Sequence, residues 1–253
     1  MGKIIKYEWR KQRTSRLIIL FGLLTCLAAF TAGTIFKKDN LAATSALFMI
    51  FGSFLVIFYT GIESLLVFNK DLRTKQSHML WMIPKSTYEI LGAKFLAAIL
   101  QMLFVFAVFA AAGLISLLIL AATSGEINML LEFIQKALES LFHLHINWGM
   151  VISVLTLIFL AWALVIITGF LAIILSRTLF LNSKFSGLFS VILFIIINYV
   201  VQRVFYSLGD LFISPDMDLA LYPVMAYALI YYTIACVGLF GISGVLADKK
   251  LSV

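Results

Sequence analysis

Six long stretches without a charged side chain constrain this sequence more than any other feature. None of them contains Asp, Glu, Lys, Arg or His, and the shortest has 18 residues. A helix needs roughly 20 apolar residues to cross the hydrocarbon core of a bilayer, and backbone groups in lipid must form their hydrogen bonds internally. The stretches therefore predict six membrane-spanning helices. They are 17–36, 40–62, 95–125, 146–176, 185–202 and 219–247.

The composition supports a surface that faces lipid. Charged residues make up only 12% of the 253 residues, about half the share in an ordinary soluble domain. A soluble fold needs more polar side chains than this to cover its surface. The composition thus excludes a soluble enzyme, a DNA-binding domain and a disordered chain. The predicted fold class is an all-α membrane protein with six transmembrane helices.

We expect one transmembrane domain over residues 1–253, with short segments between the spans. The segments outside the spans are a basic elbow helix at 3–16, a coupling loop at 69–90 and an amphipathic helix at 126–146 on the outer side. The expected spans are 17–36, 41–68, 91–122, 147–176, 185–206 and 219–247.

The basic residues predict how the chain is oriented. Fifteen of the 19 Lys and Arg residues lie in the N-terminus, in the loops after the second and fourth spans, and in the C-terminal tail. Because Lys and Arg concentrate on the cytoplasmic side of membrane proteins, we expect both termini in the cytoplasm. The same asymmetry accounts for the net charge of +7 without a nucleic-acid partner.

Two segments outside the spans have the periodicity of amphipathic helices. In 3–16, a basic stripe lies apart from Ile5 and Trp9, which predicts a helix on the inner membrane surface. It is either a simple anchor or also a contact for a cytoplasmic partner. In 126–146, a Leu-rich face recurs every 3.6 residues. His143 and His145 point apart on such a helix, so no metal site is expected. The basic stripe in 3–16 consists of Lys3, Lys6, Arg10 and Arg13.

Four polar residues near the ends of spans are candidates for a transport pathway. Glu63 lies near the inner end of the second span, and Asn198, Gln202 and Arg203 lie near the outer end of the fifth. Four-residue spacing places Asn198 and Gln202 on one helical face. Ionisable groups within a membrane are costly and often functional. Each of the four either lines a pathway or serves packing and headgroup contact.

Motifs for catalysis are sparse. The sequence has neither a phosphate-binding G-x-x-x-x-G-K-[ST] loop nor an H-E-x-x-H zinc motif. Residues 241–244 match the G-x-S-G pattern of intramembrane serine proteases, with Ser243 as nucleophile. Such a Ser needs a His to activate it, and no His follows Ser243 on a later span. Glycines every three residues are more typical of helix packing. An intramembrane hydrolase using Ser243, or a membrane scaffold without transport, is the alternative to a transporter.

The loop between the second and third spans is the most informative segment. Charged residues precede a short apolar group, Met79 to Ile83, which Pro84 ends because proline disfavours a helical residue before it. Ser86 or Thr87 can then cap a new helix, and Ser86 and Glu89 have the spacing of a capping box. The loop therefore predicts a short cytoplasmic helix with an exposed apolar face, and such a patch commonly binds a protein partner.

This loop resembles that of the ABC-2 type permeases, the membrane subunits of bacterial ABC exporters. The basic start of the chain, 7–11, and the six-span layout are also similar to that family. The matching residues of the loop are Leu80, Pro84, Lys85, Ser86, Glu89, Ile90, Leu91, Gly92 and Lys94.

The resemblance implies a transport subunit in the bacterial cell membrane with no catalysis of its own. Two permease subunits, expected to be identical, would each dock a separate ATPase subunit. ATP and Mg²⁺ would bind in that ATPase, and this chain would need no cofactor. The cargo would be an amphipathic or antimicrobial peptide or a similar hydrophobic compound. The implied ATPase-coupling residues are Arg73, His78, Met79, Leu80, Trp81, Ile83, Pro84 and Lys85.

Overall fold

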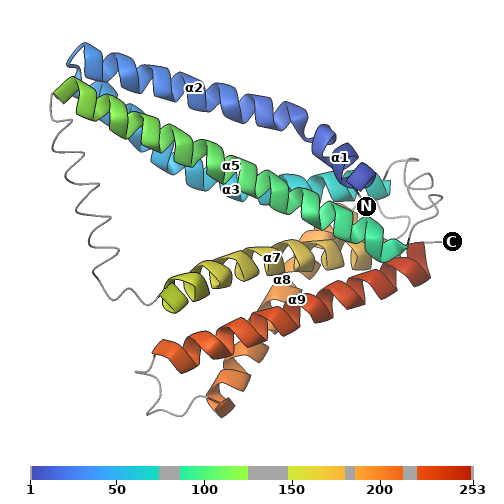
Figure 1. Cartoon of the computed structure of the whole chain (residues 1–253). Coiled ribbons are helices and arrows are strands. Elements are labelled where there is room, and N and C mark those ends of the chain that lie inside the picture. Colours follow the sequence, from blue (N-terminus) through green and yellow to red (C-terminus); the bar gives the residue numbers. More distant parts are fainter. Residues whose placement is uncertain (1, 74–85, 125–147, 180–185, 213–220, 252–253) are drawn as a thin grey trace. The chain divides into compact units, whose positions relative to one another are not determined.

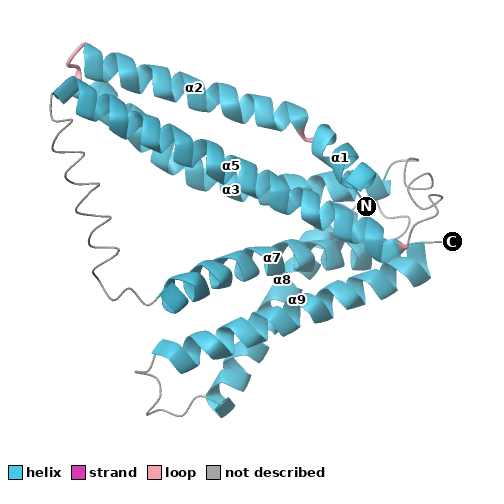
Figure 2. Ribbon diagram, viewed as in Figure 1, coloured by secondary structure: helices cyan, strands magenta, loops and turns pink. Residues whose placement is uncertain are grey.

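The computed structural model describes residues 2–73, 86–124, 148–179, 186–212 and 221–251. All regular structure in these ranges is helical (Figures 1 and 2). The helices are α1 (Gly2–Lys11), α2 (Arg13–Ile35), α3 (Asp39–Arg73), α5 (Thr87–Ser124), α7 (Trp148–Leu179), α8 (Ser186–Phe212) and α9 (Leu221–Leu251).

Every one of these helices except α1 is long and apolar enough to cross a membrane. This confirms the prediction of an all-α fold with six helices able to span a membrane, as expected of a multi-pass membrane protein. Each predicted span corresponds to one of the six helices.

Several helices extend beyond the predicted spans. The helices α3 and α5 have 35 and 38 residues, where 41–68 and 91–122 were expected. At about 1.5 Å per residue each is longer than 50 Å, whereas the hydrocarbon core is about 30 Å thick. Hydropathy marks only the part of a helix that lies in lipid, so the polar turns at its ends are missed.

The basic start of the chain forms two helices rather than one. The first, α1, ends at Lys11, and α2 begins at Arg13 after a break at Gln12. Residues 13–16 of the expected elbow therefore belong to the first long helix. The predicted basic stripe is exposed, and Ile5 and Trp9 are half-buried, as the periodicity indicates. The expected outer helix at 126–146 lies outside the described residues.

The chain divides into two compact units. Among the described residues, the N-terminal unit holds 2–62 and 96–124, and the C-terminal unit holds the others. The helices α3 and α5 each begin in one unit and end in the other. In the N-terminal unit, Leu23 of α2, Met49 of α3 and Ala112 of α5 form a buried apolar cluster. In the C-terminal unit, α7 packs against both α8 and α9 (Figure 1).

A tight turn joins α2 to α3. The N–H of Lys38 donates to the carbonyl of Gly33 at 2.8 Å, and the N–H of Lys37 donates to that of Thr34 at 3.3 Å. This is the Schellman pattern of helix ends, in which the first residue after the cap is left-handed. Lys37 has this conformation, with φ 52°. A Cβ on Gly33 would lie 2.6 Å from the backbone nitrogen of Ala42, so α2 and α3 can approach closely only with glycine there.

Candidate functional site

Polar side chains of the C-terminal unit converge where α3 ends and α5 begins. We call this group the end cluster. It joins the last turns of α3, α7 and α9 to the first turns of α5. The helices α3 and α5 flank residues 74–85, the central part of the predicted coupling loop 69–90. The end cluster consists of Asn69, Asp71, Thr87, Lys94, Arg177 and Asp248.

The central contact of the end cluster is a buried ion pair between Asp71 of α3 and Lys94 of α5. The lysine Nζ lies 2.5 Å from the carboxylate Oδ2, and the side chains are 4% exposed for Lys94 and 7% for Asp71. The same Nζ lies 5.9 Å from the ring centre of Phe68. Because an unpaired buried charge is strongly disfavoured, the contact offsets part of the cost of burying both groups. The pair therefore ties the end of α3 to the first turns of α5.

Two hydrogen bonds extend these links to α7 and α9. Arg177 of α7 donates from Nη2 to the amide oxygen of Asn69 at 2.9 Å. Thr87, the first residue of α5, donates from Oγ1 to the carboxylate of Asp248 at 2.7 Å. Hydrogen bonds to charged groups are stronger than those between neutral groups. The two helices that flank residues 74–85 are thus each bonded to a further helix of the unit.

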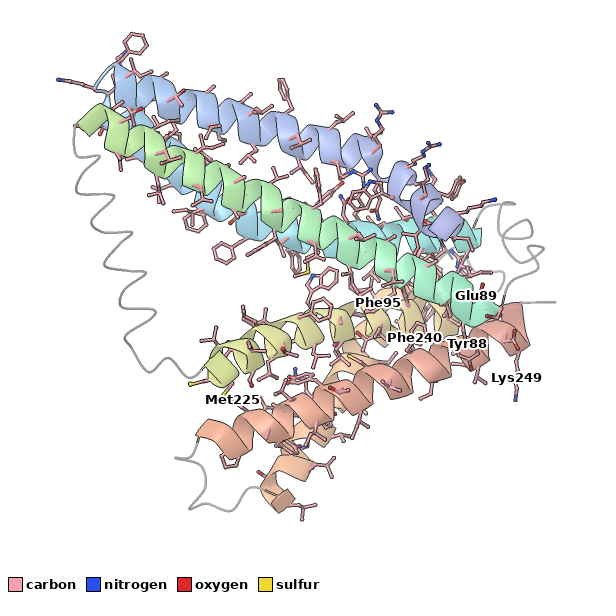
Figure 3. All side chains as sticks on the ribbon, viewed as in Figure 1. Tyr88, Glu89, Phe95, Met225, Phe240 and Lys249 are labelled. Atoms are coloured by element: carbon pink, nitrogen blue, oxygen red, sulfur yellow. The ribbon has the colours of Figure 1, made fainter. Side chains whose placement is uncertain are left out.

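Aromatic rings pack beside the end cluster between α5 and α9. The ring centre of Phe240 lies 6.5 Å from those of Tyr88 and Phe95 (Figure 3). Gly244, one turn further along α9, lies against the ring of Tyr88, where a Cβ would collide with the ring. The small residue therefore allows α9 to approach α5, the role of glycine in packed membrane helices.

The predicted start of the helix after the coupling loop is confirmed. The hydroxyl oxygen of Ser86 accepts a hydrogen bond from the N–H of Glu89 at 3.3 Å, and α5 begins at Thr87. This is the contact of a helix N-cap. The spacing of Ser86 and Glu89 in the sequence was sufficient to predict it.

The predicted coupling residues fall almost entirely outside the described residues. His78, Met79, Leu80, Trp81, Ile83, Pro84 and Lys85 lie there. Arg73 is the last residue of α3. The described parts of the predicted loop 69–90 are therefore its two helical flanks, and both contribute residues to the end cluster.

The candidate pathway residues lie on two helices. Glu63 is half-buried on α3. Asn198 is half-buried on α8, and its amide donates to the hydroxyl of Thr168 at 3.2 Å and to the carbonyl of Phe194 at 2.8 Å. Gln202 and Arg203 are exposed on α8. Asn198 thus links α8 to α7, a contact that membrane helices commonly use for packing.

Ser243 is buried in α9, with 1% of its surface exposed. Its hydroxyl donates to the carbonyl of Leu239 at 2.7 Å, one turn earlier in the same helix. This backbone contact is common for serines inside helices. The hydroxyl hydrogen of Ser243, which a catalytic base would have to remove, is therefore already donated to the backbone.

A second polar group lies in the N-terminal unit. Arg16 of α2 donates to the side-chain oxygen of Gln101 on α5 at 3.2 Å and to the backbone carbonyl of Trp9 at 2.6 Å. Its guanidinium lies 3.9 Å from the ring centre of Trp9, and that ring meets Phe104 of α5 edge-on. Cation–π contact and edge-on ring packing both stabilise this arrangement. Trp9 thereby fixes α1 to the two helices beside it.

Within the described ranges, no group of three or more His, Cys, Asp or Glu side chains could hold a metal ion. The end cluster instead connects the ends of α3, α5, α7 and α9. Its features are therefore structural contacts between helices. Sequence reasoning did not identify Asp71, Arg177 and Asp248 as parts of this site. Oppositely charged residues at the ends of apolar spans are a pattern that could have indicated them.

Comparison of the chain with protein-family models, with curated proteins and with solved structures found no match to any of them.

Proposed function

We propose that this chain is the membrane-spanning permease subunit of an ATP-driven ABC exporter in the bacterial cell membrane. Six helices able to span a membrane support this proposal, as does the resemblance of the segment between α3 and α5 to the coupling segment of ABC-2 permeases. Two copies of a separate ATPase bind ATP and Mg²⁺, and a second copy of this chain completes the transporter.

The observation that carries the proposal is the end cluster. The segment proposed to contact the ATPase starts and finishes at two helices that the Asp71–Lys94 pair holds together. The contacts of Asn69 with Arg177 and of Thr87 with Asp248 connect these helices to α7 and α9. A displacement of residues 74–85 by the ATPase would therefore act on four helices together. This chain needs no chemical step for that role, because the ATPase supplies the energy.

The proposed cargo is an amphipathic peptide or a similar hydrophobic compound. Aromatic residues make up 14% of the chain, and an apolar, aromatic path suits such molecules better than sugars. Glu63, Asn198, Gln202 and Arg203 are the proposed polar contacts along this path.

The test begins with purification of the tagged chain from its native host in mild detergent. We expect an ATPase subunit to copurify in equal amount and the complex to hydrolyse ATP. Leu80→Asp should abolish this copurification, because a charge in the apolar contact face must be desolvated. Leu80→Met, which conserves volume and polarity, is the matched control and should retain it. Unchanged recovery of the ATPase with Leu80→Asp would contradict the coupling assignment.

The same complex in liposomes tests the cargo and the competing functions. Amphipathic peptides are expected to stimulate ATP hydrolysis, and stimulation by lipids alone would contradict a peptide cargo. Ser243→Ala should leave this stimulation unchanged, whereas an intramembrane hydrolase would lose its activity. A chain that purifies without any ATPase would instead favour the hydrolase or a scaffold.

A further inference from the structure

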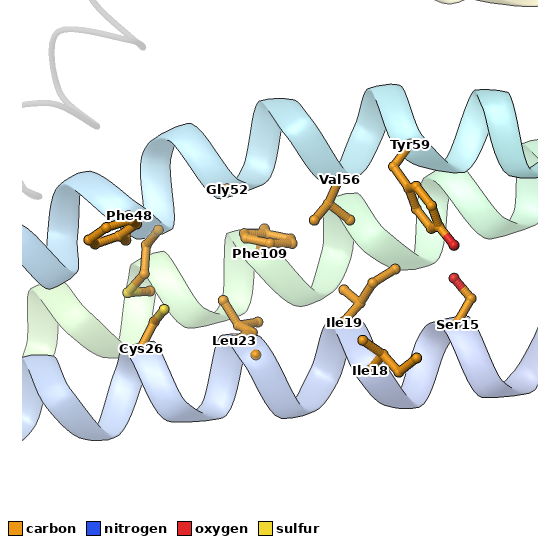
Figure 4. Close-up of a pocket in the computed structure, with 12 residues that line it drawn as sticks. Ser15, Ile18, Ile19, Leu23, Cys26, Phe48, Gly52, Val56, Tyr59 and Phe109 are labelled. Atoms are coloured by element: carbon orange, nitrogen blue, oxygen red, sulfur yellow. The ribbon is translucent and has the colours of Figure 1, made fainter.

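An apolar groove runs between α2 and α3 in the N-terminal unit (Figure 4). Its volume is about 370 Å³, within the range of roughly 300–1,000 Å³ that is usual for ligand sites. Phe109 of α5 also lines the groove, and no Asp, Glu, Lys or Arg does. A space of this size and character suits an apolar molecule.

Two glycines on facing helices leave the groove open. Gly22 of α2 and Gly52 of α3 both line it, and a Cβ added to either would meet no atom within 4 Å. Gly22 is exposed and Gly52 is half-buried, so the groove opens on the surface of the unit and is not enclosed in its core. Wall atoms that face an unfilled space lose their packing contacts, so an occupant from outside the chain would stabilise this unit.

The length of the groove indicates what fits. Along α2 its lining runs from Ser15 to Cys26, about 16 Å at about 1.5 Å per residue. This is about half of the hydrocarbon thickness of about 30 Å, which corresponds to one leaflet. A single hydrocarbon chain from one leaflet fits a groove of this length.

One end of the groove is polar and lies at the start of α2, close in the chain to two exposed basic residues. The hydroxyls of Ser15 and Tyr59 point toward one another at this end (Figure 4). Arg10 and Arg13, both exposed, precede Ser15 by only five and two residues. Exposed cations at the polar end of a hydrocarbon-sized groove are complementary to an anionic phosphate group.

We propose that the groove binds one acyl chain of an anionic phospholipid, whose phosphate is held by Arg10 and Arg13. The lipid belongs to the leaflet in which α1 lies. It fills the space between Gly22 and Gly52 and thereby joins α2 to α3. This proposal goes beyond transport and does not depend on the proposed function.

The test uses the full-length chain, purified, delipidated and studied by native mass spectrometry. Dioleoyl phosphatidylglycerol is the anionic probe, and dioleoyl phosphatidylcholine, with the same acyl chains, is the neutral one. We expect one phosphatidylglycerol per chain. Gly52→Leu and Gly22→Leu, which fill the groove from opposite helices, should each weaken its binding by at least about tenfold. Gly113→Leu is the matched control, a helical glycine with equally open surroundings outside the groove, and should bind normally.

The headgroup contact is tested with a second pair of variants. Arg10→Gln/Arg13→Gln should remove the preference for phosphatidylglycerol over phosphatidylcholine, while the matched pair Lys3→Gln/Lys6→Gln on α1 keeps it. Binding that neither glycine variant weakens would overturn the proposal, as would retention of a free fatty acid in place of phospholipid. Equal binding of both phospholipids by the unaltered chain would overturn the assignment of Arg10 and Arg13.

Discussion

The buried pair of Asp71 and Lys94 shows what single residues contribute to this protein. Both side chains are almost fully buried, and each neutralises the charge of the other. Breaking a buried ion pair by removing one partner typically costs about 3–5 kcal/mol. Replacing both with apolar side chains of similar size is often close to neutral.

We therefore expect Lys94→Met to lower the free energy of unfolding by about 3 kcal/mol. Asp71→Leu/Lys94→Met should recover most of this loss, because no charge is then left buried. The measurement is equilibrium unfolding in mixed micelles, followed by far-ultraviolet circular dichroism. Lys70→Met, at an exposed neighbour on α3, is the control and should change stability by less than about 0.5 kcal/mol. A double variant less stable than Lys94→Met would contradict this account of the pair.

The sequence shows that both charged residues are present, but it does not show that they form a pair. Asp71 and Lys94 are 23 residues apart, and many arrangements of two helices would separate them. Thr87 and Asp248 are 161 residues apart. Such contacts depend on how the helices pack, which local patterns do not encode.

At the level of elements, helix ends are where local sequence and structure agree or differ. Ser86 caps α5 as its spacing predicts, because a cap is a contact between near neighbours. The turn from α2 to α3 is less conventional. Its left-handed residue is Lys37, at a position where glycine is most common. A side chain there costs energy that glycine avoids.

We expect Lys37→Gly to stabilise the protein by about 0.5–1 kcal/mol, since the relief of strain exceeds the added flexibility of the unfolded chain. Thermal unfolding in detergent measures the change as a higher midpoint. Lys38→Gly is the matched control, because Lys38 has no such strained conformation and should gain no stability. A midpoint lowered by Lys37→Gly would show that the side chain of Lys37 stabilises the turn.

At the level of the whole molecule, the distribution of charge predicts topology. Fifteen of 19 basic residues flank the spans on one side, which predicts that both termini and the segment 74–85 lie in the cytoplasm. Transport driven by a cytoplasmic ATPase requires this orientation.

The orientation is tested with reporter fusions. Green fluorescent protein at the C-terminus should fluoresce, because it folds in the cytoplasm, and alkaline phosphatase there should be inactive. Alkaline phosphatase fused after Lys38, in the turn between α2 and α3, should be active. Active phosphatase at the C-terminus would reverse the predicted topology and remove the coupling role of residues 74–85.

The sequence by itself determined that this chain forms six membrane-spanning helices, and it located each of them within a few residues. Lipid enforces this outcome, because an uncharged stretch of about 20 residues must satisfy its backbone hydrogen bonds internally. The exposure of the basic stripe in 3–16 and the cap at Ser86 were also predicted, since both arise from residues close together in the chain.

Only the tertiary structure decided which helices meet and what lies between them. The end cluster joins residues from α3, α5, α7 and α9, and the groove depends on Gly22 and Gly52 facing the same space. Hydropathy cannot distinguish these arrangements, because a side chain toward lipid and one toward a neighbouring helix are equally apolar. The choice is made by close packing of small residues and by pairing of buried polar groups, which exist only once the helices are in contact.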